Sequence, residues 1–330
     1  MSGHGKLAFS AAMLCLSAIL ALLAGELVVR MMGHYRWTYS RAFANEPTMH
    51  EPDPVLGWRN KEGRYEYPAY VQDGESITMT ILADGRRVTS TGPPGGRRKL
   101  VFIGGSYVRG SAISDDETFA WKIQERYSSV DVVNLGTGAY GTYQSLLLLE
   151  RFLSESPPVW MVLYGFTSFH ERRNVASSIW MRTLAHYSSR GLVSVPYVTI
   201  GEDGELMRHP PARYRPWPLA EYLASVDTLQ ERLGMLSTRK RATRKREATK
   251  KLLSVMRDLC GKNDARFGVV LLGVHPRARE EYTDFLHRNG ITVIDCVHPL
   301  TPEMSVPGEG HPNARLNALW ADCIGEAIGD

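Results

Sequence analysis

Cysteine is scarce in this sequence, and the few cysteines form no recognisable pattern. The chain has four in 330 residues. Cys15 lies in an apolar N-terminal stretch, and Cys260, Cys296 and Cys323 lie outside it. They form neither a CxxC pair nor a Cys/His spacing typical of zinc sites, which excludes a metal or redox motif of that kind. Because three is an odd number, we expect buried free thiols at these positions.

The chain also lacks a charge excess and most short catalytic motifs. Its 39 Lys and Arg residues face 35 Asp and Glu residues, a net charge of +4. This balance does not favour a nucleic acid as a partner. No P-loop, HExxH or GxSxG motif occurs. The GxGxxG match at 136–141 follows the second expected strand, and no acidic residue ends the next one, which excludes a dinucleotide fingerprint. We expect no organic cofactor and no metal.

The longest stretch without charge runs from Leu7 to Gly25. As a helix it would extend about 28 Å at about 1.5 Å per residue, close to the thickness of a bilayer's hydrocarbon core. No small-x-small cleavage site precedes Glu26. Residues 1–30 are therefore predicted to be an uncleaved transmembrane anchor that contacts the membrane through residues 7–29. A cleaved signal peptide is the alternative.

Charges around this stretch do not favour an external position for the rest of the chain. Lys6 lies before it, and Arg30, Arg36 and Arg41 follow it. Under the positive-inside rule, the larger positive charge marks the cytoplasmic side.

Two further regions are expected after the anchor. Residues 31–98 are predicted to be a juxtamembrane accessory region with short strands, since 78–91 reads as strands around an Asp84-Gly85 turn. From residue 99 to 330, apolar runs alternate with helical patterns, which is typical of an α/β domain. We expect a three-layer α/β/α sandwich with a five-stranded, mostly parallel sheet. The expected strands are 99–104, 130–136, 159–166, 267–273 and 291–296.

An insertion at about 174–266 is expected within this domain. It contains a basic run, 239–251, with eight basic residues against Glu247. Such a run is usually a solvated helix face, and contact with anionic lipid or an acidic glycan is the alternative.

The strongest candidate for chemistry is a serine at the end of the first domain strand. In KLVFIGGSYVRG (99–110), a short apolar run breaks at two glycines and is followed by Ser106. Open α/β sheets place ligands at the carboxyl ends of such strands. A serine there is a nucleophile if a base and an oxyanion hole meet it, and an ordinary strand-to-helix turn otherwise.

The matching base is expected near the C-terminus. GEGHPN (308–313) places Glu309 two residues before His311, in a glycine-rich loop that opens the last predicted helix. A carboxylate so close orients the imidazole and stabilises its protonated form. The alternative for His311 is a surface or helix-capping role.

Together these segments resemble the SGNH, or GDSL-like, hydrolase superfamily, over roughly residues 99–170 and 291–328. VFIGGSYVRG resembles block one, NLGTGAYGTYQ block two and GEGHPNARLNALWADCI block five. The resemblance implies a flavodoxin-like sheet, Ser106 as nucleophile, and His311 and Glu309 as base and acid. The N-terminal anchor followed by HEPDPVLGW looks like membrane-anchored members found with bacterial exopolysaccharide genes.

Four positions depart from the family pattern. Gly105 replaces the Asp of Gly-Asp-Ser in block one. Ala139 stands where the block-two glycine falls, with Gly138 beside it, and its N–H remains usable if alanine adopts the required backbone angles. The block-three Asn falls near His170, or at Asn174 after a shift. Glu309 is one methylene longer than the usual Asp.

This resemblance implies a serine esterase that removes or transfers O-acetyl or other acyl groups on a carbohydrate, without nucleic acid. Gly138, Ala139, His170 and Asn174 are the candidate oxyanion and substrate-binding residues. The expected location is a bacterial inner membrane, single-pass, with the catalytic domain in the periplasm. The alternative is a catalytically weak, membrane-anchored protein that binds glycans during polysaccharide assembly.

Overall fold

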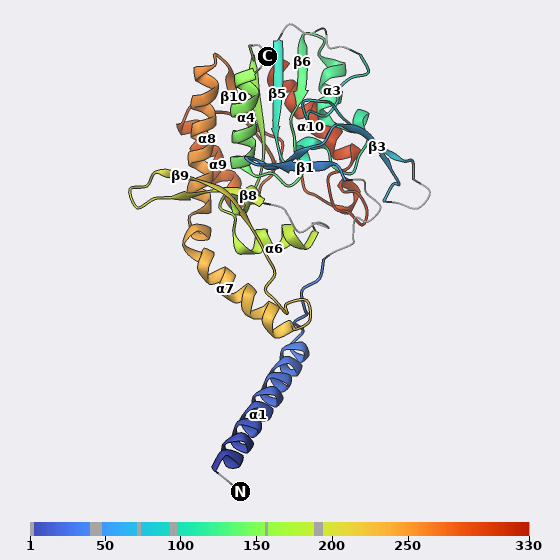
Figure 1. Cartoon of the computed structure of the whole chain (residues 1–330). Helices are drawn as coiled ribbons and strands as arrows, with labels where there is room; N and C mark the ends of the chain where they lie inside the picture. The colour runs from blue at the N-terminus through green and yellow to red at the C-terminus, as the bar shows by residue number, and fades with distance from the viewer. Residues whose placement is uncertain are drawn as a thin grey trace. The chain divides into compact units, whose positions relative to one another are not determined.

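The computed structural model describes residues 3–39, 48–70, 74–92, 95, 98–155, 158–187 and 194–329. It contains two compact units (Figure 1). One, here called the anchor unit, comprises Met1–Ala42, Ser178–Leu192 and Tyr214–Arg239. The other, here called the sheet unit, comprises Phe43–Ser177, Val193–Arg213 and Lys240–Asp330.

The sheet unit is built on five parallel strands, which confirms the predicted sheet. They are β5 (Arg98–Gly104), β6 (Val130–Asn134), β7 (Met161–Thr167), β10 (Arg266–Gly273) and β11 (Thr292–Asp295), in the spatial order β11-β10-β7-β5-β6. Every ladder between them is parallel. The first strand, β5, therefore lies between β6 and β7. This is a topological switch point, where the carboxyl ends of the strands leave a crevice for ligands.

Helices cover both faces of the sheet, as predicted (Figure 1). On one face, α3 (Phe119–Arg126) and α10 (Ala314–Gly329) pack on β5 and β6 through Phe119 and Trp320. On the other, α4 (Thr142–Glu155), α8 (Lys245–Lys262) and α9 (Pro276–Arg288) bury Leu146, Leu252 and Tyr282. All seven residues of β7 are buried, as expected of a central strand covered on both faces.

The N-terminal region holds four short strands, of which β2 supports the loop that follows β6. They are β1 (His50–Asp53), β2 (Gly57–Asn60), β3 (Gly63–Tyr67) and β4 (Ile77–Ile81). Trp58 Nε1 donates to the Gly138 carbonyl at 2.9 Å, and Asn60 Nδ2 donates to the Gly136 carbonyl at 3.0 Å. These strands belong to the sheet unit. Residues 93–94 and 96–97, at the expected boundary before residue 99, lie outside the described residues.

The expected insertion holds the hairpin β8 (Ser194–Ile200) and β9 (Leu206–Arg213), together with α6 (Ser178–Tyr187), α7 (Ala224–Thr243) and α8. The basic run lies on α7 and α8 and is largely paired with acidic groups of the chain. Arg246 and Lys250 both bind Glu281, at 2.6 Å each, and Arg244 binds Glu247 at 2.7 Å. These pairs favour a solvated helix face over an open cationic surface.

The expectation of three free thiols in this part of the chain is wrong. Cys296 and Cys323 form a disulfide with a Cα–Cα distance of 5.9 Å, between the end of β11 and α10. Only tertiary packing brings these two positions together, since 27 residues separate them in sequence. Cys260 is a buried free thiol, as predicted. Burial raises the pKa of the Cys260 thiol to about 12.

The anchor unit begins with α1 (Gly3–Met31). Its segment Phe9–Met31 is long and apolar enough to cross a membrane, a property it shares with signal sequences. The same unit contains α6 and most of α7.

Candidate active site

Ser106 lies where the sequence predicts it, at the carboxyl end of a central strand. β5 ends at Gly104, and Ser106 is the first residue of the short helix α2 (Ser106–Arg109). The side chain is largely buried, with 6% exposure. The serine therefore faces the crevice edge of the sheet, next to the loops that follow β6 and β7.

Glu309 and His311 form a tight pair in the loop before α10. The Nδ1 atom of His311 lies 2.5 Å from Glu309 Oε1, and the His311 backbone N–H donates to Oε2 at 2.8 Å. Burial raises the pKa of the Glu309 carboxyl, but these two hydrogen bonds and the charges of His311 and Arg109 outweigh burial and hold that pKa below its usual value. The pair is thus a carboxylate that fixes the orientation of an imidazole.

Tyr107, the residue after Ser106, contacts His311. Its ring centroid lies 6.0 Å from that of His311, in an edge-to-face arrangement. It also lies 5.7 Å from the Trp320 ring. Because Tyr107 directly follows Ser106, the loop of His311 lies against the residue next to the candidate nucleophile.

The loop after β6 carries a strained alanine. Ala139 has a φ of +66°, in the left-handed region that favours glycine. Its neighbour Gly138 is packed closely, since a Cβ there would lie 2.9 Å from the Arg109 guanidinium carbon. The N–H groups of Gly138 and Ala139 make no hydrogen bond within the described part of the chain. Both are therefore available as donors.

His170 opens α5 (His170–Asn174) after β7 and is fully enclosed, with 1% exposure. Its Nδ1 lies 2.7 Å from the Tyr164 hydroxyl, which in turn lies 2.9 Å from Thr142 Oγ1. A Cβ added to Gly105 would lie 2.9 Å from His170 Nε2, so this nitrogen faces the residue before Ser106. Burial, and then the charge of Arg173, lower the pKa of His170 well below its usual value. The ring is therefore neutral at pH 7.

Asn174 lies apart from this arrangement. Its Oδ1 accepts the Tyr143 backbone N–H at 3.1 Å, and its Nδ2 donates to Thr142 Oγ1 at 3.0 Å and Thr249 Oγ1 at 2.8 Å. Both ends of the amide are engaged with α4 and α8. The residue fixes the start of α4.

Arg173 is a site residue that the sequence reasoning missed. It is buried and donates from Nη1 to the Tyr140 carbonyl at 2.8 Å. A Cβ on Gly105 would lie 3.4 Å from the same Nη1. Burial, and next the charge of Arg172, lower the pKa of Arg173 to about 9. The only sequence signal is its position three residues after His170.

A second group that the sequence did not suggest is the half-buried His50. Its Nε2 lies 2.9 Å from Arg109 Nη1, so Nε2 accepts and the proton is on Nδ1. Burial and the charge of Arg109 lower the pKa of His50 to about 3. Arg109 also donates to Ser111 Oγ at 2.7 Å. Among the described residues, no group of three or more His, Cys, Asp or Glu side chains is arranged to hold a metal.

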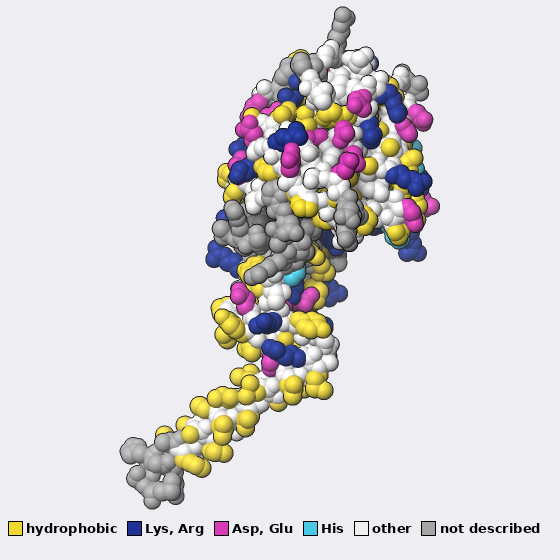
Figure 2. Space-filling view, turned by 90° about the vertical axis from the view of Figure 1, so that its right-hand side faces the viewer, with side chains coloured by type: hydrophobic (Ala, Val, Ile, Leu, Met, Phe, Trp, Pro, Cys, Tyr) yellow, Lys and Arg dark blue, Asp and Glu magenta, His cyan; other side chains and the backbone are white. Residues whose placement is uncertain are grey.

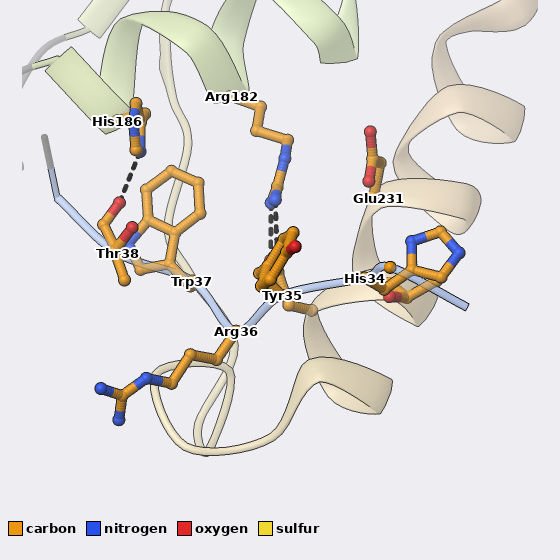
Figure 3. Close-up of a pocket in the computed structure, with 11 residues that line it drawn as sticks. His34, Tyr35, Arg36, Trp37, Thr38, Arg182, His186 and Glu231 are labelled. Carbon is orange, nitrogen blue, oxygen red and sulfur yellow. Dashed lines mark hydrogen bonds and ion pairs between the residues drawn. The ribbon is translucent and has the colours of Figure 1, made fainter. Parts of the chain in front are cut away.

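The structure contains two hollows of note, one in each unit. An open hollow of about 520 Å³ is lined by the loop of Glu309, including Leu300, Val306 and Pro307. A cavity of about 420 Å³ in the anchor unit lies between residues 34–38 and the side chains of α6 and α7 (Figure 3). In the second, Arg182 is neutralised by two hydrogen bonds to Asp227, at 2.5 and 2.6 Å.

No family model and no curated protein matches this chain. Its backbone is similar to several solved structures. A member of the lipolytic protein G-D-S-L family from Veillonella parvula DSM 2008 is 12% identical, with a TM-score of 0.43, and the match covers 70% of this chain and 98% of that one. The psychrotrophic esterase EstA from Pseudoalteromonas sp. is 9% identical, with a TM-score of 0.40, over 71% of this chain and 100% of that one. An acetyl-xylooligosaccharide esterase from Geobacillus Stearmophilus is 11% identical, with a TM-score of 0.38, over 72% and 96%.

Proposed function

We propose that this protein is a membrane-anchored serine esterase whose triad is Ser106, His311 and Glu309. The observation that carries the proposal is the Glu309–His311 pair, held at 2.5 Å in a loop whose imidazole lies against Tyr107. A carboxylate-bound imidazole at the crevice edge of the sheet, beside a serine that ends a central strand, fits nucleophilic acyl transfer.

In the proposed reaction, Ser106 Oγ attacks the ester carbonyl carbon and its proton passes to His311 Nε2. The tetrahedral intermediate collapses, and the leaving alkoxide takes that proton. Water then attacks the acyl-enzyme and gives a proton to His311, and the carboxylic acid leaves as Ser106 recovers its proton. If a sugar hydroxyl replaces water, the same steps transfer the acyl group. Glu309 holds Nδ1–H throughout.

The oxyanion is proposed to bind the N–H groups of Gly138 or Ala139 and the Nε2–H of His170. In the neutral ring Nε2 carries the proton when Nδ1 is the hydrogen-bond acceptor. The Tyr164 hydroxyl, 2.7 Å from Nδ1, is the group proposed to donate that hydrogen bond. The Tyr164 hydroxyl also lies 2.9 Å from Thr142 Oγ1, which accepts from Asn174 Nδ2 at 3.0 Å. Asn174 therefore acts through this chain of hydrogen bonds in the proposal. Arg173 adds a positive charge beside the same space.

An O-acetyl group on a carbohydrate is the substrate that we propose. The open hollow beside Glu309 offers room for part of a sugar, and its exposed Leu300 offers an apolar surface for a ring face.

We also propose that α1 is an uncleaved anchor in a bacterial inner membrane and that the sheet unit lies in the periplasm. Glu26 and Arg30, after the uncharged stretch, bind the start of α7, so cleavage would remove contacts of the folded chain. The Cys296–Cys323 disulfide supports an oxidising compartment.

The test is labelling of the full-length protein in nanodiscs with a fluorophosphonate probe, followed by assay on 4-nitrophenyl acetate and an acetylated xylo-oligosaccharide. We expect labelling of the wild type and its loss in both Ser106→Ala and His311→Ala. Ser154→Ala is the control, because that hydroxyl only donates within α4, to the Arg151 carbonyl. A folded wild type that is neither labelled nor active would overturn the esterase and favour a glycan-binding protein.

A further inference from the structure

The start of α7 is attached to the end of the anchor helix. Glu26 accepts hydrogen bonds from the backbone N–H groups of Ala224, at 2.8 Å, and Ser225, at 2.9 Å. Arg30 binds Glu26 at 2.6 Å and donates to the Tyr222 carbonyl at 3.0 Å. The carboxylate thus caps the helix N-terminus, where it also complements the helix dipole.

This attachment fixes the depth of the loop before α7 relative to the anchor. The uncharged stretch 7–25 extends about 28 Å as a helix, nearly the whole thickness of a hydrocarbon core. Glu26, the first charged residue after this stretch, lies near the end of the candidate span Phe9–Met31 and therefore close to the boundary between acyl chains and headgroups. The residues bonded to Glu26 and Arg30 lie at the same level.

The loop that leads to α7 exposes large apolar side chains at this level. We call residues 217–222 the foot loop. Within it, Trp217 is 40% exposed, Leu219 58% and Tyr222 67%. In Figure 2, hydrophobic side chains cover α1 and continue at its upper end.

Leu219 is also strained. Its φ of +71° lies in the left-handed region, which is costly for a leucine. Its carbonyl accepts the Tyr222 and Leu223 N–H groups at 2.9 and 2.8 Å, so the turn holds the side chain outward. In water, an exposed leucine in a strained conformation gains nothing, whereas in a lipid layer its side chain is buried.

We propose that the foot loop inserts into the headgroup layer of the same bilayer leaflet in which α1 ends. Tryptophan and tyrosine favour this layer, and leucine extends toward the acyl chains. The occupant of the exposed apolar surface is lipid, because the surface is continuous with the proposed span. The inference rests on the membrane anchor proposed above and is independent of the esterase chemistry.

The experiment measures depth in the full-length chain in phosphatidylethanolamine–phosphatidylglycerol nanodiscs. Leu219→Cys, and separately Tyr222→Cys, is made on a Cys15→Ala background and labelled with an NBD maleimide. Cys260 stays in place, because its buried thiol with a pKa of about 12 does not react. The matched control is Leu236→Cys, an exposed leucine (63%) farther along α7. Cys15 labelled in the native chain reports the span itself.

We expect the probe at 219 or 222 to emit at shorter wavelength than the probe at 236. Lipids that carry a nitroxide near the headgroup should quench it, and aqueous iodide should quench it less than the probe at 236. Equally strong iodide quenching at 219, 222 and 236, with Cys15 quenched by nitroxide in the acyl chains, would overturn the proposed insertion of the foot loop. The proposed span would still stand. Protection of the probe at 219 from both quenchers would indicate that a protein partner covers the foot loop. That result would also overturn its insertion into lipid.

Discussion

Gly105 and His170 share a space that admits one side chain. A Cβ atom on residue 105 would lie 2.9 Å from His170 Nε2 and 3.1 Å from the Tyr140 carbonyl oxygen. The SGNH pattern that the sequence resembles would place Asp at 105 and Asn near 170 or at 174. The His170 ring lies where a side chain at position 105 would extend.

Gly105→Asp is therefore expected to destabilise the protein. The new side chain meets the His170 ring, so we expect the free energy of unfolding to fall by about 1–3 kcal/mol and probe labelling to be lost. Adding His170→Asn should restore part of both. Thermal unfolding and labelling rates check this. Gly92→Asp, at an open position, is the control, and a harmless single Gly105→Asp would refute the packing argument.

Tyr164→Phe tests the tautomer of His170. Without the hydroxyl, Nδ1 has no donor and Nε2–H is no longer favoured. We expect kcat to fall by up to about 10²-fold, as for loss of one oxyanion donor, with KM little changed. Tyr282→Phe is the matched control, because its buried hydroxyl donates to Glu171 and not to His170. An equal loss of kcat in both variants would assign Tyr164 a structural role only.

Ala139→Gly should stabilise the protein. Relief of the left-handed strain at φ +66° outweighs the greater flexibility of glycine in the unfolded chain, so we expect a gain of about 0.5–1 kcal/mol in the free energy of unfolding. Denaturant unfolding measures it. Ala321→Gly, in the middle of α10, should instead cost about 1 kcal/mol or more. Destabilisation by Ala139→Gly would argue against the strained loop.

Glu309→Gln links the proposed triad to pH. The pKa of Glu309 is lowered on folding, so its carboxylate stabilises the native state at pH values above its ordinary pKa. That contribution is lost as the pH falls through the lowered pKa. We expect the variant to be less stable than the wild type at neutral pH, and the difference to vanish in acid.

The same variant should lose up to about 10⁴-fold in kcat, because the imidazole loses the partner of its Nδ1–H. Unfolding curves and rates measured from acid to neutral pH test both effects. Glu326→Gln, an exposed acid on α10, should change neither. A stability difference that persists unchanged in acid would show that the Glu309 charge is not its source.

The disulfide predicts how many cysteine thiols react in the unfolded protein with and without reductant. Unfolded without reductant, the protein should show two reactive thiols, Cys15 and Cys260, and with reductant all four cysteines. Cys323→Ser should lower the free energy of unfolding by about 2–4 kcal/mol. Four thiols without reductant, in protein purified from the membrane under thiol-blocking conditions, would remove the argument for an oxidising compartment.

The sequence alone determined the layers of the sheet unit and the local chemistry of two loops. Strand and helix periodicity reflect burial on one or two faces, so β5, β6, β7, β10 and β11 were readable from apolar runs. The Glu309–His311 pair was also readable, because a contact between residues two apart depends on local backbone alone.

Tertiary structure decided what depends on contacts distant in sequence. The Cys296–Cys323 pairing, the enclosure of His170 by Gly105 and Tyr164, and the position of Arg173 all require strands and helices to be brought together. The same holds for Glu26, whose charge in an apolar region has no explanation in the sequence. The structure explains it, because the first turn of α7 donates two backbone N–H groups to that carboxylate. A capping contact between residues so far apart in sequence produces no periodic pattern from which it could be predicted.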